Sequence, residues 1–185
     1  MKKLELYYPA KPYIVAQKFG IYNPAYLQFG FSKHNGEDFA VDKDGVVLAM
    51  CDGVVTETGF NSGAGNFVKY KTNEKVDVDG VPRTVGFMYM HGERILVKQW
   101  DLVKAGTPLM IADNTGFSTG PHTHISAYFL NELGNKIVLD PASNDCFDFS
   151  KFYNGFHADD AKFVESIRHV PLMVQLFALM KKIIS

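Results

Sequence analysis

The sequence predicts a mainly β protein, with an antiparallel β-sandwich as its body and a helical tail at its C-terminus. Two observations support this prediction. From residue 13 to residue 128, short β-branched and aromatic runs alternate with glycine turns, a spacing typical of all-β domains. After Gly155 the pattern changes to a helical periodicity. With 46% apolar and 21% charged residues among 185, the composition is that of a globular domain.

Five apolar runs are the clearest expected strands, at residues 46–48, 53–55, 67–70, 87–89 and 95–97. Two longer stretches resemble each other, because residues 45–53 and 103–111 each join an apolar run to a glycine turn. An internal duplication of a hairpin unit is therefore possible, which favours a symmetrical sandwich. Residues 71–83 are polar and contain the turn dipeptide Asp79-Gly80, which indicates a surface hairpin.

The C-terminal region is expected to form a helical extension, residues 156–185, to a main domain of residues 1–155. A periodic stretch runs to Val170, and Pro171 can open a second helix over residues 172–184. This apolar segment is shorter than the ~20 residues that a membrane span needs. The favoured interpretation is a helix docked on the domain or on a second copy, and the alternative is an interfacial membrane anchor.

Charge, cysteine content and the N-terminus exclude several classes of protein. The formal charge of −1 gives no electrostatic reason to expect nucleic acid as a partner. Cys51 and Cys146 are too few for a disulfide framework, so both are expected to be small buried hydrophobes. The apolar run after Met1-Lys2-Lys3 is interrupted at once, so no secretory signal is expected. If the substrate lies outside the cytoplasm, the protein would reach it by phage assembly, by lysis or through a secretory signal that was removed from this chain.

Four of the six histidines lie beside turn or strand signals in the β region, and each needs a spacing argument of its own. His34 and Asp38 are four residues apart, about 13 Å on a straight strand. The turn dipeptide Asn35-Gly36 between them is expected to fold both side chains towards one point. Imidazole nitrogen and carboxylate oxygen both suit zinc at roughly 2.0–2.2 Å.

His122 and His124 are expected to share one face of a strand, about 6.5 Å apart. This separation favours one metal ligand and one histidine beside it, rather than two ligands of one ion. His91 follows a predicted strand that ends at Met90, so it is expected where the chain turns. Alone it would be interpreted as an exposed turn residue, but beside the other histidines it becomes a candidate base.

These residues together predict a catalytic zinc site with one ion per chain. Three protein ligands and one open position distinguish a catalytic zinc site from a structural one, and His34, Asp38 and His124 supply three. No His-Glu-x-x-His helix occurs in the sequence, so the usual glutamate base is absent. His91 and His122 can take its place in proton transfer and in stabilising an oxyanion.

The order of these motifs resembles the lysostaphin-type (LytM-type) zinc endopeptidases, metallopeptidase family 23. Phe19-Gly20 precedes a His-x-Gly-x-Asp element at residues 34–38, Tyr89-Met-His91 resembles the central histidine, and residues 118–124 resemble the closing His-x-His. Asp140-Pro141 stands where such domains often end. The resemblance covers about residues 13–142.

This resemblance implies a lysostaphin-like fold with a duplicated β motif and a groove. It also implies metal binding by His34, Asp38 and His124, catalysis by His91 and His122, and hydrolysis of peptides in bacterial peptidoglycan. The protein would then act on the cell wall, outside the cytoplasm or from a phage particle. Two departures from the family, at residues 92–93 and 125–126, affect no metal ligand and bear on substrate fit.

Two other functions remain open from the sequence. One is a non-catalytic structural or binding module of a virion or secretion device, with a vestigial metal site. The other is a zinc hydrolase of a different amide bond, or a carboxypeptidase. The complete ligand set and both additional histidines favour the wall endopeptidase, for which a phage is one source.

Overall fold

The computed structural model describes residues 3–141 and 146–151. The chain divides into two compact units, residues 1–152 and 153–185, and all described residues belong to the first. The expected helical extension, and any membrane binding or self-association through it, lie outside the described residues. Within the described part, no helix is long and apolar enough to cross a membrane.

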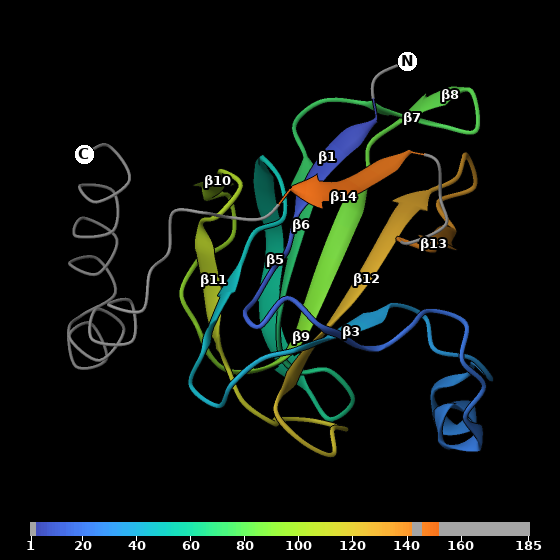
Figure 1. Cartoon of the computed structure of the whole chain (residues 1–185). Helices are drawn as coiled ribbons and strands as arrows, with labels where there is room; N and C mark the ends of the chain where they lie inside the picture. The colour runs from blue at the N-terminus through green and yellow to red at the C-terminus, as the bar shows by residue number, and fades with distance from the viewer. Residues whose placement is uncertain (1–2, 142–145, 152–185) are drawn as a thin grey trace, which may run out of the picture. The chain divides into compact units, whose positions relative to one another are not determined.

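The described part consists of short strands and one 3₁₀ helix (Figure 1). The helix η1 spans Pro24–Phe29. The strands are β1 (Leu4–Tyr7), β2 (Val15–Gln17), β3 (Glu37–Ala40), β4 (Val46–Leu48), β5 (Gly53–Asn61), β6 (Gly65–Thr72), β7 (Val76–Val78), β8 (Val81–Arg83), β9 (Gly86–Ile95), β10 (Leu102–Val103), β11 (Pro108–Ala112), β12 (His122–Leu130), β13 (Lys136–Leu139) and β14 (Phe147–Lys151).

One antiparallel sheet of ten strands carries the fold. Its main path runs β10-β5-β6-β9-β12-β3-β2, with β9 at its centre between β6 and β12 (Figure 1). The last residues of β9 pair with β11, which in turn pairs with β4. The prediction of a mainly antiparallel β body is confirmed.

The two sequence stretches that resemble each other are paired in space. β4 pairs with β11, and β5 pairs with β10, so each stretch supplies one strand to each pair. This reciprocal arrangement is the one that a duplicated hairpin unit would produce. The expected surface hairpin is also present, since β7 pairs with β8 through a turn with positive φ at Asp79 and Gly80.

The strands alternate between a buried face and the face that carries the site. On β9, Phe87 and Tyr89 are fully buried and pack with Tyr70 of β6. Met88 and Met90 project to the opposite face because side chains alternate along a strand. The hydroxyls of Tyr70 and Tyr89 accept from the amide of Met50, so these buried polar groups are satisfied.

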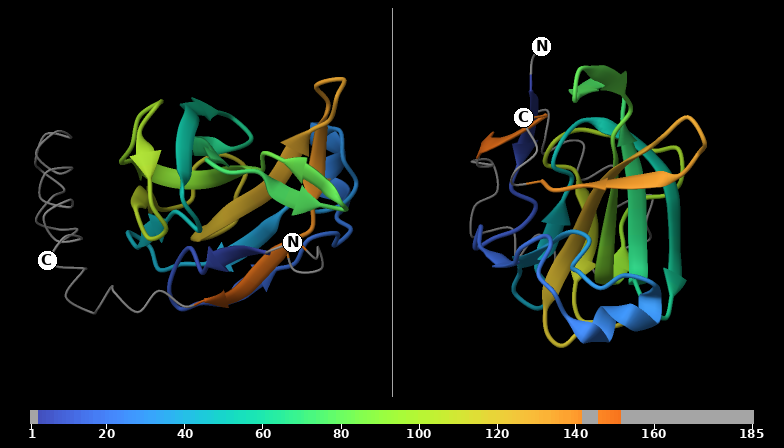
Figure 2. Two further views of the ribbon diagram at one scale, coloured as in Figure 1. Left: turned by 90° about the horizontal axis from the view of Figure 1, so that it is seen from above. Right: turned by 90° about the vertical axis from the view of Figure 1, so that its right-hand side faces the viewer.

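A separate pair of strands lies against this core. β1 and β14 are parallel, unlike the strands of the main sheet, and lie side by side in both views of Figure 2. Leu6 of β1 and Phe147 of β14 are buried in the core. Cys51 and Cys146 are both buried and form no disulfide, which confirms the sequence prediction for both.

Two details of the predicted strands are wrong. The strand that was expected to end at Met90 continues through His91 to Ile95, and Leu96 and Val97 lie beyond it. His91 has φ of 70°, and the register between β6 and β9 is irregular at this point. A local bulge, rather than the end of the strand, therefore redirects the histidine side chain.

Candidate metal centre

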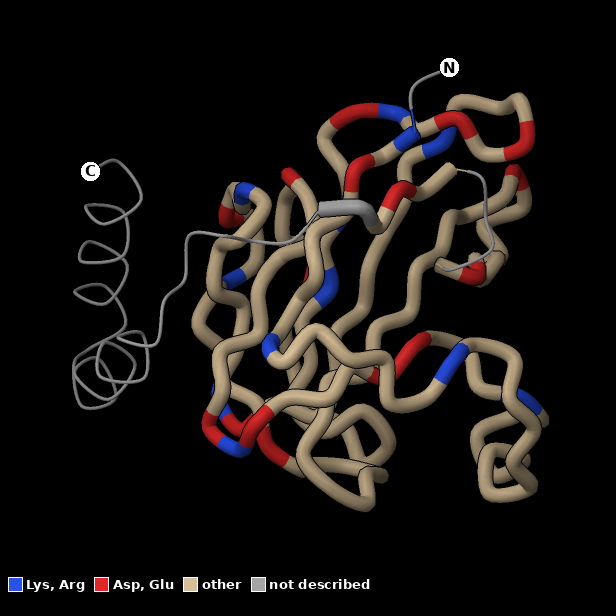
Figure 3. The backbone as a smooth tube through the Cα atoms, viewed as in Figure 1, with Lys and Arg blue, Asp and Glu red and all other residues tan. Residues whose placement is uncertain are grey.

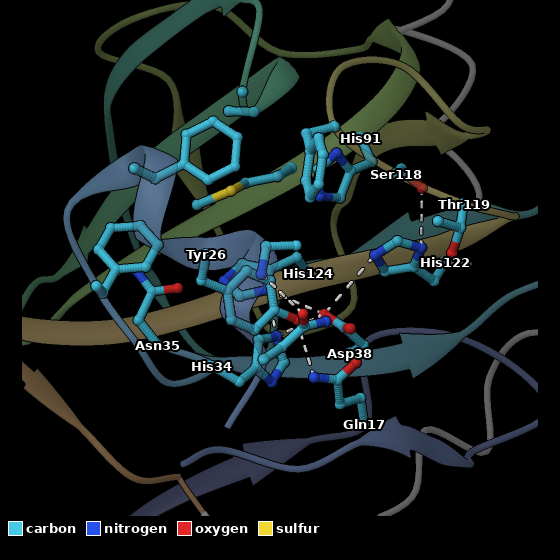
Figure 4. A pocket seen from close by; sticks show the side chains of 18 of the residues that line it. Gln17, Tyr26, His34, Asn35, Asp38, His91, Ser118, Thr119, His122 and His124 are labelled. Carbon is cyan, nitrogen blue, oxygen red and sulfur yellow. Dashed lines mark hydrogen bonds and ion pairs between the residues drawn. The ribbon is translucent and has the colours of Figure 1, made fainter. Parts of the chain in front are cut away.

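Three side chains converge on one point at the face of the sheet, and these are the three predicted ligands (Figure 4). Nε2 of His34 lies 3.1 Å from Oδ1 of Asp38 and 2.9 Å from Nδ1 of His124. The third side of the triangle, from Nδ1 of His124 to Oδ1 of Asp38, is also 2.9 Å. All three residues are buried, with exposed fractions of 8% or less.

Strand register brings two of these residues together. β12 pairs antiparallel with β3 so that His124 lies directly opposite Asp38. Directly opposed residues on neighbouring strands have their side chains on the same face, about 5 Å apart at Cβ. His34 precedes β3 and joins them from the segment that leads into the strand. The site therefore depends on two strands that are 86 residues apart in sequence at these positions.

The role predicted for Asn35-Gly36 is wrong in its detail. The chain bends there without forming a hairpin turn, and Gly36 does not have a positive φ. A Cβ at Gly36 would lie 2.4 Å from the carbonyl oxygen of Ile125 and 2.6 Å from Nε2 of His124. Glycine is needed at this position because the backbone passes directly against the ligand strand.

Hydrogen bonds orient both ligand imidazoles. Nδ1 of His34 donates to the carbonyl oxygen of Lys18 at 2.9 Å, which leaves Nε2 with a lone pair towards the centre. His124 faces the centre through Nδ1, and its Nε2 lies 3.0 Å from Oγ of the fully buried Ser126. Tyr26 of η1 stacks on His34, with ring centroids 5.7 Å apart.

Burial and mutual contact change the ionisation of these groups. Burial favours neutral Asp38, but hydrogen bonds and charges from His124 and His34 outweigh it and hold the pKa of Asp38 below its usual value. Burial also favours neutral His34, yet the carboxylate of Asp38 raises the pKa of that histidine. For His124, burial dominates and its pKa is lowered.

The donor set fits a zinc ion. Two imidazole nitrogens and a carboxylate oxygen are ligands that zinc prefers, with bonds of roughly 2.0–2.2 Å. Ligand atoms at those distances in a tetrahedron are about 3.3–3.6 Å apart, close to the 2.9–3.1 Å seen here. Two histidine nitrogens and a carboxylate oxygen thus converge at a spacing that could hold one metal ion.

His91 lies beside this triangle and is held by a rigid neighbour. Its Nδ1 donates to the carbonyl oxygen of Thr115 at 2.8 Å, so Nε2 is left as an acceptor. The hydroxyl of Thr115 donates to the carbonyl of Gly92 and accepts from the amide of Asn66. Burial lowers the pKa of His91 to about 4, which keeps the imidazole neutral.

His122 is the fifth residue of this group. Its ring centroid is 4.8 Å from that of His91, and its Nε2 is 3.7 Å from Oδ1 of Asp38. Its Nδ1 donates to the carbonyl of Gly120 at 2.8 Å and contacts the hydroxyl of Ser118. The structure thus brings all five predicted residues into one pocket of about 380 Å³.

The residues that support this group were not predicted from the sequence. Ser126 was visible only as a departure from the family, and nothing indicated its contact with His124. Tyr26 lies in the short helix η1 and Lys18 lies outside any helix or strand, and the sequence predicted no element for either. Their positions depend on contacts that local pattern cannot supply.

A comparison with protein families identifies the family of the chain. The model of peptidase family M23 matches residues 32–137, which include all five residues of the group. The chain belongs to peptidase family M23.

Several named proteins are similar in sequence to this M23 domain. The glycyl-glycine endopeptidase ALE-1 of Staphylococcus capitis is 36% identical over 65% of this chain and 31% of its own length. The peptidoglycan DD-endopeptidase ShyB of Vibrio cholerae is 36% identical over 58% of this chain and 23% of its own length. The chain therefore spans less than a third of either relative.

A solved structure supports the fold assignment of the M23 domain. A zinc-containing peptidase from Vibrio cholerae superposes with a TM-score of 0.57 and 26% identity, covering 74% of this chain and 39% of that one. The fold similarity extends well beyond the residues of the metal centre.

Proposed function

We propose that this M23 domain is a zinc-dependent endopeptidase that hydrolyses stem or cross-link peptides of bacterial peptidoglycan. The observation that carries the proposal is the convergence of three ligand atoms within 3.1 Å of one another, beside two further imidazoles that open into the same pocket. Hydrolysis of an amide bond can be catalysed by a single metal ion with two adjacent groups that transfer protons.

His34, Asp38 and His124 would hold the zinc ion in this proposal. A bound zinc ion polarises a carbonyl group and lowers the pKa of a bound water to about 7. Hydrogen bonds to the carbonyl of Lys18 and to the hydroxyl of Ser126 fix the imidazoles so that their ligand atoms already face the centre. Preorganised ligands of this kind reduce the cost of assembling a site.

His91 and His122 are the proposed catalytic pair. Hydrolysis adds one water to the bond, so one proton must leave the water and one must reach the departing amine. The two rings lie together at 4.8 Å, and each uses Nδ1 to donate to a backbone carbonyl. Each Nε2 therefore carries a lone pair that can accept the proton of the water. The ring that has taken this proton can then donate it to the carbonyl oxygen as it gains charge, or to the departing amine.

Charge in the pocket favours an endopeptidase over a carboxypeptidase. A carboxypeptidase needs a cation for the free carboxylate of its substrate. The pocket lining contains no lysine or arginine among the residues that the structure describes, and Asp38 is its one acidic residue there. A neutral peptide segment that continues on both sides of the cut bond fits this surface better than a chain end.

The named relatives support peptidoglycan as the substrate and the cell wall as the place of action. ALE-1 is described as a glycyl-glycine endopeptidase and ShyB as a peptidoglycan DD-endopeptidase. The alternative, a structural module with a vestigial site, is disfavoured because all three ligands and both further histidines are present and oriented.

Purified protein tests the proposal through zinc content and peptidoglycan hydrolysis. We expect close to one zinc per chain and release of new amino groups from purified peptidoglycan, which a chelator abolishes and added zinc restores. Asp38→Ala should lose both zinc and hydrolysis. Asp52→Asn is a matched control, because Asp52 pairs with Lys104 away from the pocket and its replacement should change neither.

Each result has a clear meaning for the proposal. Zinc without amino-group release from walls of several cross-link types would contradict the peptidoglycan substrate. Absence of zinc, with hydrolysis unaffected by the chelator, would contradict the metal centre itself. Loss of both zinc and hydrolysis in Asp52→Asn would mean that the two measurements report the folding of the protein rather than the metal centre.

A further inference from the structure

Two phenylalanines form an aromatic wall on one side of the pocket. Phe29 ends η1, Phe117 lies in the loop between β11 and β12, and their ring centroids are 5.0 Å apart at 65°. Both line the pocket and remain partly exposed, at 36% and 42%. Met88 and Met90 of β9 line the same pocket from the sheet. This surface is apolar and is not used by the chemistry described above.

The wall lies next to the residues of the metal centre. In a 3₁₀ helix, residues three apart lie on the same face, so Phe29 lies on the same face of η1 as Tyr26. The ring of Tyr26 stacks on the metal-site residue His34. At the other end, Phe117 immediately precedes Ser118, whose hydroxyl contacts His122. The Phe29–Phe117 pair therefore connects the ligand side of the pocket to the side of the proposed catalytic pair.

The wall is fixed before any substrate arrives. The amide of Phe117 donates to the carbonyl of Gly63, in the turn between β5 and β6, at 2.9 Å. A Cβ at Gly63 would lie 3.3 Å from Cε1 of Phe29, so this ring rests directly on the same turn. Asn61 holds the turn by accepting from the amides of Gly63 and Ala64. A preformed apolar surface does not need to be ordered when a ligand binds.

The segments around the wall carry no charge. Residues 19–32, 58–68 and 114–131 contain no Lys, Arg, Asp or Glu. In Figure 3 the helix η1 and the loops at the bottom centre are correspondingly tan, while charged positions begin at the lower left edge of the sheet. A charged substrate side chain would lose hydration here without gaining a partner, so the surface favours an uncharged one.

We propose that the wall of Phe29 and Phe117 receives an aliphatic side chain of the residue beside the cut bond, so that the enzyme prefers alanyl over glycyl peptides. This inference rests on the proposed peptidase function and specifies its substrate. Glycine has no side chain to cover the rings, whereas each methyl group buried against them favours binding about fourfold. The two named relatives do not decide the matter, since one is named for glycyl-glycine bonds and the other is not.

The test uses the zinc-loaded chain and a pentapeptide series. Pentaglycine is compared with peptides in which single glycines are replaced by L-alanine or D-alanine. Both binding, by titration calorimetry, and hydrolysis, by release of amino groups, are measured for each peptide. We expect at least one alanyl peptide to bind about fourfold more tightly than pentaglycine, and its kcat/KM to exceed that of pentaglycine if both are cut.

Variants of the wall connect this preference to its residues. Phe117→Ala should bring the ratio of alanyl to glycyl affinity, and the corresponding ratio of kcat/KM, towards one. Phe117→Leu should keep most of this preference because leucine is still apolar. A general loss of structure would lower both values together and leave their ratio unchanged. Phe60→Ala is the matched control, since Phe60 is 66% exposed on β5 outside the pocket lining, and it should keep the wild-type ratio.

The outcomes separate this inference from the proposed function. Tighter binding of an alanyl peptide that disappears in Phe117→Ala would support the wall even if neither peptide were hydrolysed, and only the peptidase proposal would then fail. Hydrolysis of both peptides with a ratio of one, or a glycyl preference, would overturn the wall while leaving the peptidase proposal intact. A ratio that Phe117→Ala leaves unchanged, while its affinity for pentaglycine stays at the wild-type value, would do the same.

Discussion

The metal centre and the aromatic wall occupy the same pocket but are built in different ways. Asp38 and His124 are neighbours because β3 and β12 are in register. Phe29 and Phe117 are neighbours because the end of η1 and the loop between β11 and β12 meet at the turn around Gly63. Backbone hydrogen bonding of a sheet fixes geometry over many residues, whereas a contact between loops can change with one substitution. In these proposals the chemistry depends on strands of the sheet, and the selectivity depends on segments outside it.

The largest expected effect is on the catalytic rate, when one of the two proposed proton-transfer histidines is removed and the metal ligands are kept. We expect His91→Ala and His122→Ala each to keep wild-type zinc content and to lower kcat by ~10²–10⁴-fold, because neither imidazole belongs to the ligand triangle. Zinc analysis and amino-group release on the same samples check this. Full turnover in either variant would remove that histidine from the proposed pair, and loss of zinc would assign it to the metal centre.

A smaller effect should come from disturbing the contact between the strands of the site. Gly36→Ala places a Cβ 2.4 Å from a backbone oxygen of β12, which cannot move independently of the sheet. Overpacking of this kind costs about 1–3 kcal/mol, so we expect lower stability in urea and weaker zinc binding.

The matched control for this change is Gly120→Ala. A Cβ at Gly120 would have no atom within 4 Å, and its φ is not positive, so this variant should unfold like the wild type. Equal stability of the two variants would contradict the close approach of Gly36 to β12.

The smallest effect should come from the hydroxyl that supports His124. When Nδ1 is the ligand atom, Nε2 carries the proton and donates to Ser126, and such supporting contacts are worth ~10–100-fold in metal affinity. We expect Ser126→Ala to weaken zinc binding by this amount in a chelator competition. Ser118→Ala removes a hydroxyl next to His122 instead, so it should keep wild-type zinc affinity. Identical affinities in both variants would exclude the positioning role of Ser126.

Sequence reasoning was effective where a residue's position follows from strand periodicity. Alternation along residues 122–124 placed both histidines on one face, and the structure has them there, with His122 beside the triangle and His124 within it. The same reasoning failed at His91, because a positive φ inside β9 is not encoded by any pattern of apolar residues. It also attributed the bend at residues 35–36 to a turn, whereas lack of space beside His124 requires the glycine.

The wall could not have been predicted at all. Phe29 and Phe117 are 88 positions apart, and neither lies in a strand with a recognisable period. Their contact results from the paths of three loops, which depend on the completed sheet. Features of this kind require coordinates, since no local signal distinguishes a phenylalanine that lines a pocket from one that is simply exposed.

The long sequence separation within the ligand triangle has a consequence for how the protein matures. His34 and His124 are 90 positions apart, and β12 must insert between β9 and β3 before they can meet. A growing polypeptide cannot complete the triangle until most of the domain has been synthesised and the sheet has closed, a slow and non-local event. Zinc would then bind only the finished sheet and stabilise it by mass action. Occupancy of the site would therefore report that folding is complete, and the hydrolase would stay inactive until that moment.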